Sequence, residues 1–220
     1  MKKILFLLMI ILVSLPSMSQ GKKYQKGMLK AIELMNDAAD PESSLQCVTT
    51  FEEFAQKYPD QWIPFYYASQ ILIIASLEES DPAKSDTLLV RAKKSLDKAS
   101  ELAPEESEIH VLKALYYIGM MSVDPATRGP EYFQDVTWEL DRAKELGPEN
   151  PRAAFLDGMM AMNLPDYMGG GPAAAKPIFL DAEKKFNEFQ NNDPLWPSWG
   201  TDQVKEELEK LKDIEIEEKE

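Results

Sequence analysis

The chain has 220 residues, and its 38 acidic and 24 basic side chains give a formal net charge of −14. Such an acidic protein repels phosphate backbones and anionic lipid headgroups, which disfavours nucleic acid as a partner. One cysteine, Cys47, and one histidine, His110, are too few for an internal disulfide or for a zinc site built from Cys and His. We therefore predict neither a metal site nor a cofactor.

The first 19 residues have the layout of a secretory signal peptide. Two lysines precede an unbroken apolar run at residues 4–13 and a small-residue pattern at residues 17–19. This run has 10 residues, whereas a membrane-spanning helix needs about 20. We predict cleavage after Ser19, which removes two lysines and no acid and leaves 201 residues with net charge −16. The mature protein is then periplasmic or secreted, without a stable membrane anchor; the alternative is an uncleaved anchor.

Apolar residues recur at helical spacing along almost the whole chain, and strand-like alternation is absent. This pattern predicts an all-α protein. Pro82, Pro151 and Pro172 are expected in first turns, where no amide donor is needed, and Thr201 is expected to cap the last helix. The predicted helices span residues 22–38, 42–58, 61–79, 84–103, 106–122, 131–146, 151–163, 173–190 and 201–217.

An internal repeat appears at the prolines that end every second predicted helix. The shared spacing is a small residue, a large one, a small one and then proline, and it resembles the second helix of the tetratricopeptide repeat. The small position of the first helix then falls on Ser69, Ala114 and Gly158, where close packing of two helices requires a small side chain. The matching sets are Cys47, Phe51, Phe54 and Pro59; Ala92, Leu96, Ala99 and Pro104; Val136, Leu140, Ala143 and Pro148; and Ala175, Phe179 and Ala182, with Asn187 at the proline position.

The resemblance implies a solenoid of about four tetratricopeptide-like (TPR-like) hairpins over residues 20–200, followed by a capping helix and acidic tail at 201–220. The prolines lie 45 and then 44 residues apart, whereas the standard repeat has about 34. We expect the extra length between the helices of each hairpin, at residues 78–86, 123–130 and 163–171.

The same resemblance assigns a binding groove to the first helices of the hairpins. The groove positions are mostly apolar and lack the Lys, Arg and Asn that hold charged peptide ends. We therefore expect the groove to be filled by a partner helix, by the chain's own terminal helix or by an apolar small molecule; alternatively, these positions are simply core. The candidate binding residues are Tyr66, Gln70, Leu115, Phe155, Met159 and Met162.

The run Gly169, Gly170 and Gly171 precedes a predicted helix and has two interpretations. Free backbone amides at a helix start can bind an anion, or the glycines form a tight turn with positive φ angles. Lys176 is followed by Pro177, so a phosphate loop is excluded. Together with the preceding proline and aromatic residue, this run is also similar to exported bacterial TPR-like proteins, among them the T component of tripartite ATP-independent periplasmic transporters.

Trp196 and Trp199 lie in a proline-rich segment before the last predicted helix. They are expected either to cover the apolar face that the final repeat leaves open or to stack on a ligand. Cys47 and His110 are expected to pack in or near the core.

Three function classes follow. The first is a non-catalytic protein-binding or scaffold module whose partner is another envelope protein. The alternative is a periplasmic binder of a small apolar ligand, associated with transport in the manner of the T component. An enzyme is the third, and no catalytic residue can be assigned because the sequence carries none of the usual hydrolase, metalloprotease or calcium-loop spacings.

Overall fold

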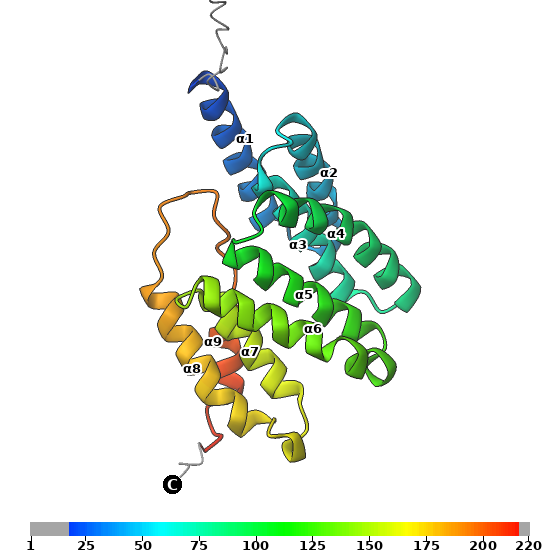
Figure 1. Cartoon of the computed structure of the whole chain (residues 1–220), viewed down its shortest axis with the longest axis vertical. Helices are drawn as coiled ribbons and strands as arrows, with labels where there is room; N and C mark the ends of the chain where they lie inside the picture. Colours follow the sequence, from blue (N-terminus) through cyan, green and yellow to red (C-terminus); the bar gives the residue numbers. More distant parts are fainter. Residues whose placement is uncertain (1–17, 216–220) are drawn as a thin grey trace, which may run out of the picture.

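The computed structural model describes residues 18–215, and this part of the chain is all-helical, without a strand. The all-α prediction is confirmed. Most of the predicted signal peptide, residues 1–17, lies outside the described residues, as does the end of the acidic tail. The helices, shown in Figure 1, are α1 (Met18–Asn36), α2 (Pro41–Lys57), α3 (Trp62–Glu78), α4 (Pro82–Leu102), α5 (Ser107–Val123), α6 (Pro125–Leu146), α7 (Pro151–Asn163), the short 3-10 helix η1 (Asp166–Met168), α8 (Pro172–Glu188) and α9 (Thr201–Lys210).

Helices that follow one another in the chain pack side by side, most extensively in the pairs α3–α4, α5–α6 and α7–α8. The α5 helix also contacts α3 and α7, so the odd-numbered helices from α3 to α7 form a connected row. One continuous apolar core runs through all nine α-helices of residues 18–215. Because α3 and α5 are packed on several sides, their sequences are apolar nearly all round.

The residues that define the repeat are buried in α4, α6 and α8, and so are the small residues Ser69, Ala114 and Gly158 on the facing helices. The first set differs, because Cys47 and Phe54 are only half-buried and Val48 and Ala55 take the core positions. Phe54 turns instead towards α1, where a Cβ atom on Gly27 would lie 2.5 Å from its ring. Whether the hairpins form a regular solenoid stays a prediction.

The extra length of the α3–α4 and α5–α6 hairpins lies inside their helices and not between them, contrary to our expectation. The α4 and α6 helices have 21 and 22 residues, and a single residue, Asp124, separates α5 from α6. The side chains of Asp81 and Asp124 accept hydrogen bonds from backbone amides of the following helix, which begins with proline in both cases. Within residues 18–215, only the α7–α8 hairpin has a long connection between its helices, residues 164–171.

The connection 189–200, orange in Figure 1, leaves α8 and runs back along the molecule before α9 begins. The Tyr67 hydroxyl donates to the Leu195 carbonyl at 3.1 Å, and the Trp196 ring meets the edge of Trp62 at 5.6 Å. This segment therefore ties the C-terminal part of the chain to α3.

The last helix differs from its prediction at both ends. Gly200, with φ of 108°, precedes α9, so Thr201 is the first helical residue and not the cap. A Cβ atom on Gly200 would lie 2.3 Å from the Phe186 ring. The helix ends at Lys210 in a turn, short of the predicted residue 217.

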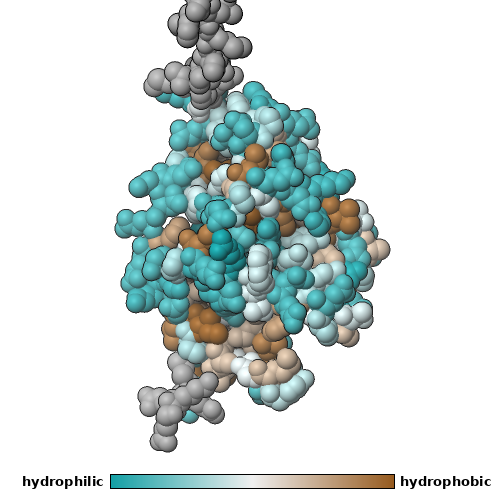
Figure 2. Space-filling model, viewed as in Figure 1, coloured by the Kyte–Doolittle hydropathy of each residue, from teal (hydrophilic) through white to brown (hydrophobic). Residues whose placement is uncertain are grey.

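Figure 2 shows one face that is mostly hydrophilic, with small separate hydrophobic areas. Within residues 18–215, no helix is long and apolar enough to span a lipid bilayer.

Candidate functional site

A cleft lies between the C-terminal end of α1, the middle of α3 and the start of α9. It consists of two adjoining hollows with volumes of about 490 and 380 Å³. The two hollows share Met35, Asn36, Gln70 and Gln203 in their walls. Pockets that hold small ligands typically have volumes of about 300–1,000 Å³, so the cleft is of ligand size.

One face of α3 forms the floor of the cleft. The spacing of its lining residues, 70, 71, 74, 75 and 78, is that of neighbours along one side of a helix. The end of α1 and the start of α2 close the larger hollow. Its full lining is Met35, Asn36, Ala38, Ala39, Asp40, Ser44, Gln70, Ile71, Ile74, Ala75, Glu78 and Gln203.

The opposite wall belongs to the smaller hollow and comes from Trp199 and the first residues of α9. The Trp199 indole N–H donates to the Tyr66 hydroxyl at 2.8 Å, and that hydroxyl faces Glu108 Oε2 at 3.2 Å. Glu108 Oε1 accepts from Arg152 Nε at 2.7 Å, and both of these charged side chains are at most 2% exposed. A buried ion pair on α5 and α7 therefore supports the position of Trp199.

The network also joins the first turns of α5 and α7. Asn150 caps α7 by accepting from the Arg152 amide at 3.0 Å, and its side-chain amide donates to Glu108 Oε1 at 2.8 Å and to Ser107 Oγ at 2.9 Å. Burial and the nearby Glu108 raise the pKa of Tyr66 well above its ordinary value. The Tyr66 hydroxyl therefore stays protonated and donates a hydrogen bond to the Glu108 carboxylate.

Replacing Tyr66 with phenylalanine should destabilise the protein by about 1–3 kcal/mol, because the change leaves the Trp199 N–H and one Glu108 oxygen without a partner. Urea denaturation measures the loss, and the tryptophan emission of the folded variant should change because Trp199 loses its hydrogen bond. Tyr116→Phe is the matched control: Tyr116 is also buried, but its hydroxyl has no hydrogen-bond partner among the described residues. Equal losses in the two variants would contradict a special role for Tyr66.

Comparison with known proteins shows that a solved structure has a similar fold. No family model matches the sequence, and no curated protein matches it. The fold is similar to that of the HusA haemophore from Porphyromonas gingivalis. The TM-score is 0.78 at 25% sequence identity, and the alignment covers 91% of this chain and 99% of HusA. The likeness to HusA extends over nearly the whole helical domain; it does not bear on the TPR-like interpretation, which stays a prediction.

The predicted groove residues do not all reach the cleft. Gln70 lines both hollows, and Trp199 lines the smaller one. Tyr66 is fully buried and acts on the cleft only through Trp199. Leu115 and Phe155 are buried in the core, because α5 and α7 are covered by their neighbours at these positions. The half-buried Met159 and Met162 on α7 are absent from the lining of either hollow.

The three glycines before α8 form a tight turn. The amides of Gly169, Gly170 and Gly171 donate to the carbonyls of Asp166, Pro165 and Ala161 at 2.9, 3.2 and 2.9 Å. None of the three remains a free donor for an anion. Gly169 and Gly171 have φ angles of 82° and 92°, which explains the choice of glycine at both positions.

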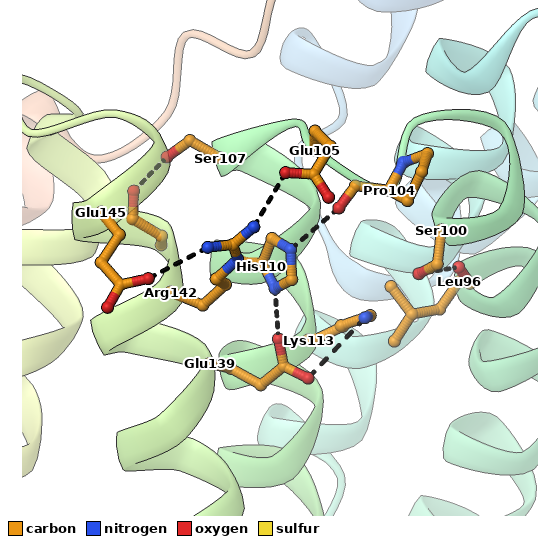
Figure 3. A network of polar contacts seen from close by, with 11 residues as sticks. Leu96, Ser100, Pro104, Glu105, Ser107, His110, Lys113, Glu139, Arg142 and Glu145 are labelled. Atoms are coloured by element: carbon orange, nitrogen blue, oxygen red, sulfur yellow. Dashed lines mark hydrogen bonds and ion pairs between the residues drawn. The ribbon is translucent and has the colours of Figure 1, made fainter.

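The remaining candidates have packing roles. Trp196 is half-buried against Trp62. In Figure 3 the His110 ring lies between Glu139 and Pro104: Nδ1 is 2.6 Å from Glu139 Oε2, and Nε2 is 3.1 Å from the Pro104 carbonyl oxygen. Both ring nitrogens thus face acceptors, and neither is open to a metal. Burial raises the pKa of the Cys47 thiol, which disfavours the reactive thiolate.

Sequence reasoning missed the contribution of α1 and α2 to the cleft, above all Met35, Asn36 and Asp40. The repeat predicts groove positions by their distance after the proline that ends the preceding hairpin. No such proline precedes α1, so the repeat predicts no groove position on that helix. Within residues 18–215, no group of three or more His, Cys, Asp or Glu side chains is arranged to hold a metal ion.

Proposed function

We propose that this protein is a non-catalytic, exported binding protein that holds a small, largely apolar ligand in the cleft between α1, α3 and α9. A flat macrocycle of the haem class is the first ligand to test. The observation that carries the proposal is a cleft of ligand size in a domain whose fold matches a haemophore over 91% of the chain. It favours a ligand carrier over a scaffold for another envelope protein.

The walls of the cleft suit a flat apolar molecule. Ile71 and Ile74 offer an aliphatic floor, Trp199 offers an aromatic edge, and the flexible thioether of Met35 adapts to the shape of its partner. The rest of the lining is polar, above all in the smaller hollow, so the apolar contacts come from this part of the cleft.

Two lining side chains are of types that ligate haem iron, Met35 and Tyr67. The Tyr67 hydroxyl already donates to the Leu195 carbonyl, and burial raises its pKa above the ordinary value, so it stays protonated. An axial bond from Tyr67 is therefore not expected, and contact with the faces of the ring is expected to supply most of the binding energy.

Export and the repeat architecture belong to the same proposal. The layout of residues 1–19 supports delivery across the cytoplasmic membrane, where a carrier of external ligands is needed. The paired packing of α3–α4, α5–α6 and α7–α8 supports TPR-like hairpins. Kinship with the transporter T component rests on the sequence likeness of the glycine turn and of the repeat spacing.

Titration of the chain from Gln20 onward with haemin should show saturable binding near or below about 1 μM, followed by the Soret band and by quenching of tryptophan emission. Ile74→Glu should weaken binding at least about tenfold, because it places a charge on the apolar floor of the cleft.

Val90→Glu is the matched control, because Val90 is an exposed aliphatic residue on α4 outside the cleft lining. Both variants should keep the circular dichroism of the parent. Absence of saturable binding, or equal affinities for the two variants, would count against the cleft. Purification from the cell envelope with a stoichiometric protein partner and no small molecule would favour the scaffold.

A further inference from the structure

The α1 helix carries a stripe of positive charge on its solvent face. At about 100° per residue, the four lysines of this helix fall within an arc of roughly 100°. The opposite side of α1 holds Met28, Ala31 and Ile32, which are buried in the core. All four lysine side chains are exposed, and no acidic residue lies between Met18 and Glu33. This basic stripe consists of Lys22, Lys23, Lys26 and Lys30.

The basic stripe has no acidic partners. Among the described residues, none of its lysines forms an ion pair, whereas most lysines and arginines outside α1 do. Lys22, Lys26 and Lys30 follow one another at intervals of four residues, so like charges are neighbours along the helix and destabilise it. After the predicted cleavage, Lys22 and Lys23 lie in the first turn, where the helix dipole also disfavours positive charge. A stabilising role in the fold therefore does not explain the stripe.

Two exposed leucines border the basic stripe. Leu29 is 40% exposed and Leu34 is 52% exposed, and the helical spacing places one on each side of the lysines. Figure 1 shows α1 at one end of the molecule, where its first turns project beyond α2. A basic helix face of this kind is typical of a segment that lies on a membrane surface, because lysines pair with lipid phosphates and neighbouring leucines enter the headgroup region.

From these observations we infer that α1 is a docking surface for a membrane that exposes anionic lipid headgroups. The net charge of −14 opposes the approach of the protein to such a surface. At physiological ionic strength, however, charges more than about 8 Å away are largely screened, so the lysines nearest the lipid dominate. Each lysine close to an anionic surface strengthens binding about fivefold. Docking through four lysines is reversible, which distinguishes it from a membrane anchor, and it does not depend on a ligand in the cleft.

Co-sedimentation with lipid vesicles tests this inference on the chain from Gln20 onward. Vesicles of equal parts phosphatidylglycerol and phosphatidylcholine should bind the protein, whereas vesicles of phosphatidylcholine alone should not. Binding to the anionic vesicles should fall at least about tenfold in about 1 M salt, where charges more than about 3 Å apart are screened.

Two triple variants with the same change of charge assign the binding to residues. Lys22→Gln combined with Lys26→Gln and Lys30→Gln should weaken binding to the anionic vesicles at least about tenfold. The same variant should be at least as stable as the parent in urea, because like-charged neighbours are removed. The matched control makes the same change at three exposed lysines outside α1 that form no ion pair among the described residues: Lys84, Lys94 and Lys184.

The outcomes also separate this inference from the proposed function. Absence of binding to the anionic vesicles, equal affinities of the two triple variants, or a clear loss of stability in the α1 variant would overturn membrane docking. Association of α1 with an acidic protein but not with vesicles would overturn it as well. Haemin titration is independent of these results, because the lysines of the stripe lie outside the lining of the cleft. If vesicles bind and haemin does not, only the proposed function fails.

Discussion

Replacing Arg152 with alanine is expected to lower the free energy of unfolding by about 3–5 kcal/mol. The guanidinium and its partner Glu108 are almost fully buried, and the arginine also lies 5.5 Å from the Phe189 ring and 5.9 Å from the Trp199 ring. Removing it leaves a carboxylate inside the protein with its charge uncompensated, and it removes the support that positions Trp199 at the cleft. Urea denaturation followed by circular dichroism measures the loss.

A second arginine provides the control. Arg142 pairs with Glu105 and Glu145, as Figure 3 shows, but all three side chains are at least a third exposed. Arg142→Ala should therefore change stability by about 1 kcal/mol or less. Joint replacement of Arg152 and Glu108 by apolar residues of similar size should be less damaging than Arg152→Ala alone, since no unpaired charge remains. Additive losses would contradict the buried-pair explanation.

Replacing Phe179 with alanine is also expected to lower the free energy of unfolding by about 3–5 kcal/mol. Phe179 on α8 is fully buried, and its ring fills the space above Gly158 on α7, where an added Cβ atom would lie 2.5 Å from a ring carbon. In the parent protein, Gly158→Ala should therefore be destabilising by about 1–3 kcal/mol through overpacking.

In the Phe179→Ala background, the same Gly158→Ala change should become stabilising by about 0.5–1 kcal/mol, because the clash is gone and alanine favours helix over glycine. This reversal of sign in a double-mutant cycle tests the contact directly. Leu180→Ala, at the exposed neighbouring position, should change stability by about 1 kcal/mol or less. If Gly158→Ala destabilises both backgrounds equally, the two residues do not share the space.

Much of the fold could be predicted because helices carry local signals. Within residues 18–215, apolar spacing predicts all nine α-helices but not the 3-10 helix η1, and Pro82, Pro151 and Pro172 each begin an α-helix. The predicted start of α6 at residue 131 is wrong, because Pro130 lies inside the helix and not before it. The first turn before it is held by the Asp124 cap and by an ion pair between Arg128 and Asp86 of α4. That pair spans 42 residues and leaves no local pattern.

The cleft could be predicted only in part, for the same reason. Gln70 lies on the first helix of a hairpin, where the repeat predicts a groove residue, and it does line the cleft. Leu115 and Phe155 are predicted from the same repeat, but they are buried in the core. Asn36 and Gln203 come from opposite ends of the chain and meet only because the connection 189–200 folds back. Neither residue has a sequence feature that predicts this contact across the chain.

The fold-back of residues 189–200 also determines when the two walls of the cleft come together. Trp199 and Tyr66 are 133 residues apart in sequence, and Leu195 and Tyr67 are 128 apart. Contacts between such distant residues form late in folding, because a long loop must close first. If the chain is exported N-terminus first, as the proposed function requires, α1 and α3 emerge before residues 198–203. The cleft is then complete only after those last residues have emerged and folded back against α3.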